Sequence, residues 1–589
     1  MAILPFENLS GRADLEWMSR GFAEAMRLSL AGSAARQVFY AGALRDVPAS
    51  SATGVLQGYF SIEGGALRVH AVVENVENHR MVFAADVAGP ESQGMLPLAE
   101  AVARNLDYDH RPAPTHNAGA FHAYIEALEA SAPASADAAF ERATQTDPAF
   151  GAAWLAWAQS LAARNERSRA IQVILAARER KVEFPDLERL RLEVLAGGIA
   201  GDRQAEQHAL IELAQADRGD ASVRRSLGDL AMAAREWLHA AAWYEQVLER
   251  EPDNVGAWNQ LGYARLWAGD APGAVSALST YRRLRPADAN PIDSLGDVHY
   301  YSSKFADAEK LYLEAGARDP GFLGGGEYYK AAWARLMRGD VKGADELFAR
   351  FVNARQPAGD PLITFRLAEW EYLSGRRKGG IARLEQLARS GPPPVAAISL
   401  GQLSIWLLET GDRARARQYA GMLKMTDGIA ALARFLTQPP ASPEEWKRRL
   451  AAAFPGPAGT PLRRIALPYA LLFAGEYQAA IDPLDELDRA SDPSSAARPA
   501  VALARALAET GDFRRLPELV NPNPAPDPLG QHLFAAVAFP RVLFLRGLIA
   551  EREGRQAEAR QQYALYVQFL GDLAPASRDT DRARAALGK

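Results

Sequence analysis

The first part of the chain alternates between helix-like and strand-like hydrophobic patterns. Apolar residues recur every three or four positions from Leu15 to Leu30, the spacing of one buried helix face. Between residues 55 and 87 apolar and polar residues alternate instead, and Gly64-Gly65 separates two of these runs as a hairpin turn would. A second helical pattern follows. Residues 1–112 are therefore predicted to form a small α/β domain.

The remaining residues, 113–589, repeat one helical pattern. A polar turn position such as Asp270, which follows Gly269, recurs at spacings of 34 and then 36 residues. Self-similarity at such a period indicates helix–turn–helix units that bury their apolar faces by stacking on their neighbours. The marker positions are Asp202, Glu236, Asp270, Lys304, Asp340, Arg376, Asp412, Glu476 and Asp512.

Three consecutive units place the same residue types at the same positions. A glycine and an alanine stand where two helices would cross closely, and large residues fill the space between units. A proline ends each second helix because it cannot continue the hydrogen-bond ladder. The matching residues are Leu227, Gly228, Ala240, Tyr244 and Pro252, then Trp258, Leu261, Gly262, Ala274, Leu278 and Pro286, then Leu295, Gly296, Ala308, Tyr312 and Pro320.

These units closely resemble the tetratricopeptide repeat (TPR) family. The resemblance implies a mostly α fold, an α-α superhelix of about 12 repeats over residues 113–589 after the small α/β domain. The period is irregular at 421–460 and at 521–530, where prolines gather. It also implies that a protein or peptide binds in the concave groove of the superhelix.

In TPR proteins, the second, fifth, ninth and twelfth positions of each first helix face that groove. Here they form a mixed polar and aromatic set, which suits hydrogen bonding and stacking on an extended peptide. The alternative is that these residues only line a solvated surface or pack between repeats. The candidates are Arg225, Asp229, Asn259, Tyr263, Asp293, Asp297, Tyr300, Tyr329, Trp333 and Glu369.

The first residues of the chain carry a second motif, a short strand followed by a polar turn. The turn lacks the glycines and lysine of a phosphate-binding loop, so we expect Asn8 or Ser10 to hydrogen-bond its backbone. The motif resembles the TolB N-terminal-like domain of bacterial proteins, which implies the sensory or interaction part of a regulatory system. Its residues are Leu4, Pro5, Phe6, Asn8, Ser10 and Gly11.

Composition bears on which partners the protein binds and on where in the cell it is found. The net charge of -5 gives no overall basic field, which disfavours nucleic acid as a partner. The sequence has no cysteine, which excludes disulfides and thiolate chemistry. No run of residues reaches the length and apolarity of a membrane span, and no signal peptide precedes the first strand. We expect the chain as given to be cytoplasmic, whereas a periplasmic location would require residues before Met1.

No catalytic, cofactor-binding or metal-binding motif occurs, so the sequence favours a non-enzymatic interaction scaffold without cofactor or metal. Two alternatives stay open. A small-molecule sensor would have an apolar pocket between the α/β domain and the first repeats, near Trp17, Phe39, Tyr59 or Trp154. An enzyme would need titratable groups from scattered positions to converge in one cleft. The sequence does not determine the oligomeric state.

Overall fold

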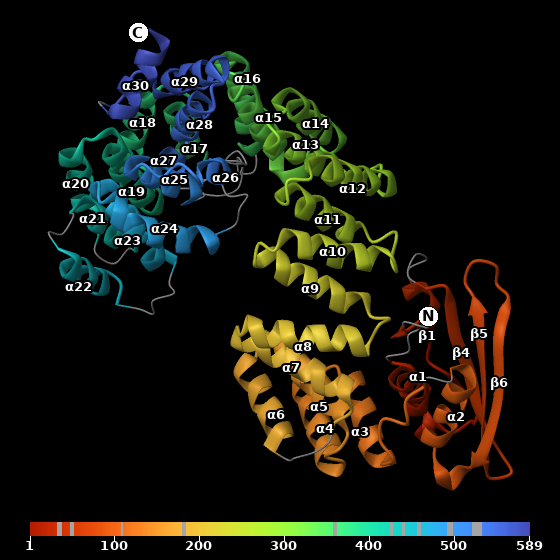
Figure 1. The fold of residues 1–589 in the computed structure, drawn as a ribbon. Helices are drawn as coiled ribbons and strands as arrows, with labels where there is room; N and C mark the ends of the chain where they lie inside the picture. The colour runs from red at the N-terminus through yellow and green to blue at the C-terminus, as the bar shows by residue number, and fades with distance from the viewer. Residues whose placement is uncertain are drawn as a thin grey trace. The chain divides into compact units, whose positions relative to one another are not determined.

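The computed structural model divides the protein into two compact units, Met1–Asp270 (unit 1) and Ala271–Lys589 (unit 2) (Figure 1). The predicted boundary at residue 112 lies within unit 1. The irregular segment 521–530 lies outside the described residues. The structure describes residues 1–31, 38–47, 52–107, 110–179, 184–356, 362–424, 428–438, 442–455, 461–491, 499–520, 533–575 and 577–588.

Unit 1 begins with a mixed sheet in the order β3-β1-β4-β5-β6, with β2 paired to β4. The strands β4, β5 and β6 are antiparallel, whereas β1 runs parallel to both β3 and β4. The predicted hairpin is confirmed, and Gly64 and Gly65 take positive φ angles of 59° and 77° in its turn. The strands are β1 (Ala2–Ile3), β2 (Glu7–Asn8), β3 (Phe39–Tyr40), β4 (Gly54–Glu63), β5 (Ala66–Asn75) and β6 (Met81–Pro90).

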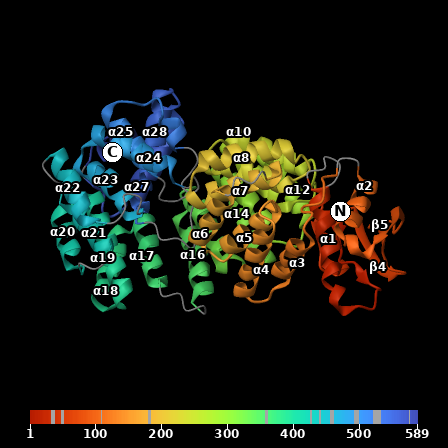
Figure 2. The ribbon, with the colours of Figure 1, turned by 90° about the horizontal axis from the view of Figure 1, so that it is seen from below.

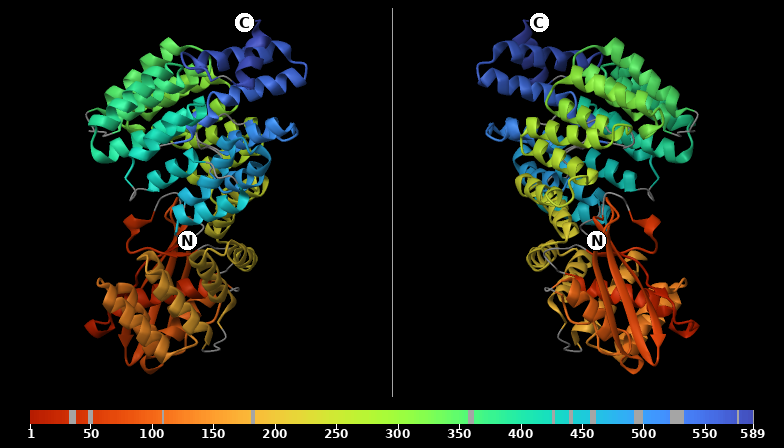
Figure 3. Two further views of the ribbon diagram at one scale, coloured as in Figure 1. Left: turned by 90° about the vertical axis from the view of Figure 1, so that its left-hand side faces the viewer. Right: turned by 90° about the vertical axis from the view of Figure 1, so that its right-hand side faces the viewer.

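Two helices, α1 (Trp17–Leu30) and α2 (Leu96–Leu106), lie on the side of the sheet that faces α3 (Ala118–Glu129) (Figure 1). The right-hand view of Figure 3 looks onto the opposite face of the strands. Phe22 of α1 and Phe60 of β4 belong to the same hydrophobic core as Phe121 of α3. The sheet domain and the first repeats therefore share one core.

The polar turn after β1 is held by side-chain hydrogen bonds. Asn8 Nδ2 donates to the Arg12 carbonyl oxygen (3.0 Å), and Asn8 Oδ1 accepts from the Ser10 amide (3.1 Å). The Ser10 hydroxyl accepts from the Arg12 amide (3.2 Å). The prediction that Asn8 or Ser10 satisfies this turn is confirmed.

Helix pairs make up the rest of unit 1. Each has the helix–turn–helix form of a tetratricopeptide repeat, and successive pairs stack along the chain (Figure 1). After α3 the helices are α4 (Pro133–Thr146), α5 (Gly151–Ala163), α6 (Arg167–Glu179), α7 (Asp186–Ala200), α8 (Arg203–Ala216), α9 (Ala221–Ala233), α10 (Trp237–Leu248) and α11 (Val255–Trp267).

The marker that revealed the period is the N-cap of a second helix. Asp340 accepts a hydrogen bond from the Gly343 amide (3.0 Å) at the start of its helix, and Asp202 caps α8 in the same way. The residue before the cap has a positive φ, as at Gly339 (83°), which glycine adopts without strain. The positive φ recurs with the repeat, and the side-chain cap is added where the marker is Asp202, Asp340 or Asp412.

In two of the repeats, a tyrosine ring of the second helix packs against a glycine of the first helix. A Cβ atom at Gly228 would lie 2.8 Å from the ring of Tyr244, and one at Gly296 would lie 2.6 Å from the ring of Tyr312. The missing side chain is what lets each ring pack directly against the backbone of the first helix. This contact explains why both residue types recur at fixed positions.

Unit 2 continues the repeats, and its later helices lie beside its earlier ones. In Figure 2, α24, α25 and α28 (blue) lie beside the helices α17 to α23 (green to cyan). Its helices are α12 (Ala271–Leu284), α13 (Asn290–Tyr301), α14 (Phe305–Arg318), α15 (Gly326–Leu336), α16 (Val341–Arg355), α17 (Ile363–Leu373), α18 (Arg377–Ser390), α19 (Pro393–Thr410), α20 (Arg413–Met422), α21 (Gly428–Thr437), α22 (Pro443–Ala453), α23 (Pro461–Ala474), α24 (Tyr477–Arg489), α25 (Pro499–Thr510), α26 (Leu516–Val520), α27 (Ala535–Ala538), α28 (Arg541–Arg552), α29 (Gln556–Leu570) and α30 (Arg578–Leu587).

Direct contacts link the end of unit 2 to turns of its earlier repeats. Gln568 of α29 donates from Nε2 to the Gly339 carbonyl oxygen (3.1 Å), and the Asp572 amide donates to the Gly375 carbonyl oxygen (3.2 Å). The last helix pair thus contacts the α15–α16 and α17–α18 turns, so the unit closes on itself.

Candidate functional site

Four of the predicted groove residues lie in unit 1, on the first helices of two consecutive repeats. Arg225 and Asp229 of α9 are exposed, and Asn259 and Tyr263 of α11 are half-buried. Arg225 and Asn259 are 34 residues apart, as are Asp229 and Tyr263, so the four occupy two equivalent positions in each repeat. We call these four residues the first-helix face. Asp229 also accepts a hydrogen bond from the Tyr244 hydroxyl (2.6 Å), which fixes its carboxylate.

Two further candidates, Asp293 and Asp297 of α13, form a buried ion cluster with Lys330 of α15. Lys330 Nζ lies 2.7 Å from both carboxylate oxygens of Asp293 and 2.6 Å from Oδ1 of Asp297. The same ammonium stands 4.7 Å from the ring centroid of Tyr312, whose hydroxyl donates to Asp297 (2.8 Å). Burial raises the pKa of Asp293 to about 6, although the Lys330 charge opposes the shift. These carboxylates therefore join helices within unit 2.

The aromatic candidates of unit 2 are also buried. Tyr300, Tyr329 and Trp333 are only 1%, 7% and 6% exposed. Trp333 meets Phe539, just before α28, edge to face with ring centroids 5.0 Å apart. The ring of Tyr329 lies 5.2 Å from that of Phe351. Closure of the unit thus covers Trp333, and the neighbouring helix α16 packs against Tyr329.

The last predicted groove residue, Glu369 of α17, is half-buried. The predicted groove residues therefore differ in solvent accessibility. The four residues of the first-helix face and Glu369 reach solvent. Neighbouring helices of unit 2 bury Asp293, Tyr300, Tyr329 and Trp333, and the half-buried Asp297 is bound by Lys330.

Comparison with known proteins yields only partial alignments to solved structures. No protein-family model matches the sequence, and no curated protein does. Several solved structures of TPR proteins align over part of the chain. They include MamA from Desulfovibrio magneticus RS-1, at 17% identity over 29% of this chain and 96% of that one, with a TM-score of 0.26.

Two other alignments are of the same kind. YrrB, a TPR protein described as having an unusual peptide-binding site, aligns at 16% identity over 31% of this chain and 94% of its own, with a TM-score of 0.28. The C-terminal part of a TPR repeat-containing protein from Cytophaga hutchinsonii aligns at 17% identity over 40% of this chain and 94% of its own, with a TM-score of 0.33. At these scores, functional conclusions depend on the residues of this chain.

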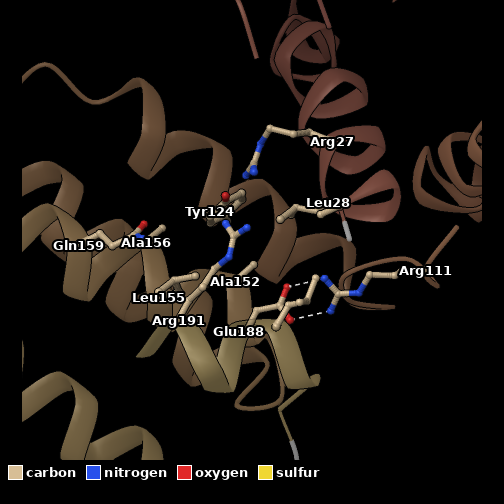
Figure 4. Close-up of a pocket in the computed structure, with 12 residues that line it drawn as sticks. Arg27, Leu28, Arg111, Tyr124, Ala152, Leu155, Ala156, Gln159, Glu188 and Arg191 are labelled. Atoms are coloured by element: carbon tan, nitrogen blue, oxygen red, sulfur yellow. Dashed lines mark hydrogen bonds and ion pairs between the residues drawn. The ribbon is translucent and has the colours of Figure 1, made fainter. Parts of the chain in front are cut away.

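A second feature of unit 1 is a small pocket where α1 meets α3, α5 and α7. It has a volume of about 70 Å³ and is lined by side chains from the sheet domain and from the repeats. Figure 4 shows the guanidinium groups of Arg27 and Arg191 pointing toward Tyr124 from different helices. The lining residues are Arg27, Leu28, Ala31, Arg111, Tyr124, Ala152, Leu155, Ala156, Gln159, Leu187, Glu188 and Arg191.

Each arginine of this pocket has a carboxylate partner. Arg111 binds Glu188 in a bidentate pair, with N–O distances of 3.0 and 2.6 Å, and Arg27 Nε donates to Glu24 (2.7 Å). Arg191 donates from Nη2 alone, at 3.0 Å to Asp217 and 3.1 Å to Asp220. Among the described residues, its Nε and Nη1 make no hydrogen bond.

The pocket differs from the apolar one that the sequence suggested at this junction. Trp17 stacks on His122 (4.2 Å between centroids), and Trp154 is buried and donates from Nε1 to the Pro148 carbonyl oxygen (3.1 Å). Phe39 lies in β3, and Tyr59 borders a separate hollow beside β2 and β4. Sequence reasoning missed the arginines because they are far apart in the chain and match no motif.

Within the described residues, the structure groups no three His, Asp or Glu side chains in a way that could hold a metal ion. None of the helices found there is long and apolar enough to cross a membrane.

Proposed function

We propose that the chain is a non-enzymatic interaction scaffold that binds an extended protein segment or peptide on the first-helix face of unit 1. The observation that carries the proposal is the accessibility of Arg225, Asp229, Asn259 and Tyr263, compared with the burial of most of their counterparts in unit 2. A guanidinium, a carboxylate, an amide and a phenol provide both donors and acceptors for a peptide backbone. The tyrosine ring adds a surface on which a side chain can stack.

The chemistry of the buried charges supports a role without catalysis. Asp293 and Lys330 are each less than one-tenth exposed and bind one another, so a substrate does not reach them. Three of the four charged residues that line the pocket of unit 1 are arginines, which do not serve as general bases because they stay protonated.

In this proposal the sheet domain is of the TolB N-terminal-like kind and the chain acts in a bacterial regulatory system. The support is the motif from Leu4 to Gly11 and the hydrogen-bonded turn that it forms. The shared core between the sheet and the first repeats fits a domain that caps the exposed end of a repeat array.

The test is affinity capture from cells of the source organism with the full chain and with an Arg225→Ala, Tyr263→Ala double variant. We expect recovery of the specific partner to fall at least tenfold in the double variant. The matched control is Leu238→Ala, which removes a 74% exposed side chain from the second helix α10. Equal recovery with all three proteins would disprove binding on this face.

A second measurement locates the contact. Hydrogen exchange of the chain with and without the captured partner should show new protection in peptides from α9 and α11. Protection confined to other helices would contradict the proposal even if the double variant weakened capture.

A further inference from the structure

The pocket of unit 1 is lined by guanidinium groups. Its lining contains three arginines and one glutamate, and the carboxylates that pair with Arg27 and Arg191 belong to residues outside the lining. Glu188 is already engaged by both Nη atoms of Arg111, so this pair forms a fixed wall. The other two guanidinium groups are those of Arg27 on α1 and Arg191 on α7.

These two arginines can donate further hydrogen bonds. Nε of Arg27 donates to Glu24, and the same guanidinium also hydrogen-bonds Tyr124. Nη2 of Arg191 donates to the two aspartates outside the pocket. Arginine carries five N–H donors in a planar fork, which suits the oxygens of a carboxylate or phosphate. The two guanidinium groups point toward the same Tyr124 hydroxyl, so an oxyanion placed between them can accept hydrogen bonds from both.

Tyr124 supplies a neutral donor at the centre of the pocket. Its side chain is 2% exposed, and burial together with the nearby Glu24 carboxylate raises its pKa to about 12. The phenol therefore keeps its proton at physiological pH and can donate to an anion. Gln159 adds an amide to the wall.

The size and accessibility of the pocket limit the ligand to a small group. A volume of about 70 Å³ holds several water-sized atoms, since one water needs at least about 10–15 Å³. The side chains of Arg111 and Arg191 are 22% and 31% exposed, so the site is open to solvent. A phosphate or carboxylate group fits this space, whereas a nucleotide or a folded partner does not.

We infer that this pocket binds a small oxyanion, a phosphate or carboxylate group, between Arg27, Arg191 and Tyr124. The anion would join α1 of the sheet domain to α3 and α7 of the repeats. The inference is independent of peptide binding on the first-helix face.

The experiment titrates the full chain with inorganic phosphate or with malonate at constant ionic strength and pH 7.5, and follows heat of binding and Tm. Sodium chloride at the same ionic strength is the reference for unspecific salt effects. We expect saturable binding of at least one of the two oxyanions and an increase in Tm that chloride does not produce. Phosphate alone or malonate alone would identify which oxyanion the site takes.

Two variants locate the site. Arg27→Gln removes one donor group and should weaken binding at least tenfold, and Ala156→Leu should abolish binding by filling the pocket while it leaves every arginine in place. The matched control is Arg142→Gln, which breaks an exposed ion pair with Glu126 on the repeats and should change affinity less than twofold. If Arg27→Gln does not fold, as judged by circular dichroism, Ala156→Leu decides the question.

Hydrogen exchange provides a separate readout. Bound oxyanion should protect peptides from α1 and α7 together. Absence of saturable binding, or binding that is unchanged in Arg27→Gln and Ala156→Leu, would overturn the inference.

Discussion

At the scale of single residues, the least compensated group is Glu327 in the first turn of α15. Its side chain is fully buried, and neither carboxylate oxygen accepts a hydrogen bond from another described residue. Burial raises its pKa from 4.5 to about 7, with Asp293 and Asp319 adding to the shift and Lys330 opposing it. The environment therefore favours the protonated form.

This shift predicts a pH-dependent stability. The folded pKa exceeds the unfolded value, so the folded state binds more protons between pH 4.5 and about 7 and loses stability as pH rises through that window. Glu327→Gln should therefore raise the free energy of unfolding by about 2–3 kcal/mol at pH 8 and have little effect at pH 4.5. Urea unfolding of both proteins at the two pH values measures the difference.

The control for this prediction is Glu346→Gln, which changes an exposed carboxylate on the neighbouring helix α16. Its effect should be small and the same at both pH values. A stabilisation by Glu327→Gln of equal size at pH 4.5 and pH 8 would show that the carboxyl does not titrate in this window.

At the scale of the helix pair, the contact between a first-helix glycine and a second-helix tyrosine sets how closely the helices pack. In Gly296→Ala the new methyl group would lie 2.6 Å from Cε1 of Tyr312. The tyrosine cannot move away easily because it is fully buried and hydrogen-bonded to Asp297. A cost of overpacking of about 1–3 kcal/mol should outweigh the helix-propensity gain of about 1 kcal/mol.

Thermal unfolding monitored by circular dichroism tests this expectation, with Gly256→Ala as the matched control. Gly256 is exposed in the first turn of α11, and its nearest neighbour to a new Cβ would be 3.4 Å away. We expect Gly296→Ala to lower Tm and Gly256→Ala to leave it unchanged or slightly higher. Equal Tm values for the two variants would mean that the helix pair can separate without cost.

A buried ion cluster that joins the later helices of unit 2 also acts at the scale of helix packing. Glu409 of α19 lies 2.6 Å from Arg541 of α28 and 3.2 Å from Arg505 of α25, and Arg541 also pairs with Asp579 of α30. Burial would raise the pKa of Glu409, but the charges of Arg541 and Arg505 outweigh it and lower the pKa. The carboxylate stays ionised, so it links three helices.

Removal of this carboxylate should be costly. Glu409→Gln leaves two arginines without their shared charge, and loss of one partner from a buried pair costs about 3–5 kcal/mol. Chemical denaturation should show that loss, whereas Asp512→Asn, which breaks a pair with the 88% exposed side chain of Arg514, should leave stability nearly unchanged. A small effect of Glu409→Gln would contradict the burial of the cluster.

At the scale of a whole unit, closure is the feature that decides which repeat surfaces remain accessible. In unit 2 the ring of Phe539 covers Trp333, and the last helix pair reaches the turns at Gly339 and Gly375. In unit 1 the equivalent first-helix positions of α9 and α11 reach solvent. One repeat pattern therefore yields a packed interior in one unit and a candidate binding face in the other.

Phe539→Ala tests this closure. Loss of a buried phenylalanine typically costs about 3–5 kcal/mol. Hydrogen exchange should increase in peptides from α15, α17 and α28, and Trp333 should become more accessible to fluorescence quenchers. The matched variant Phe513→Ala removes a half-buried ring and should affect those peptides less. Unchanged exchange at α15 in Phe539→Ala would show that this contact does not hold the unit closed.

The sequence by itself determined the local structure. The period of 34 and then 36 residues placed turn caps such as Asp202 and Asp340, and it placed the contact between Gly228 and Tyr244. Both features depend on residues within one helix pair. The hairpin and the turn at Asn8 were predictable for the same reason, since each is formed by residues close in the chain.

Only the tertiary structure decided which predicted groove residues are accessible and where the arginine pocket lies. Closure of unit 2 brings Gln568 to Gly339 across 229 positions, and no pattern inside one repeat encodes such a contact. Arg27, Arg111 and Arg191 come from three distant segments and meet through the core shared by the sheet and the first repeats. Stacking adds a small rotation at each repeat, so the final neighbours depend on the sum of many interfaces.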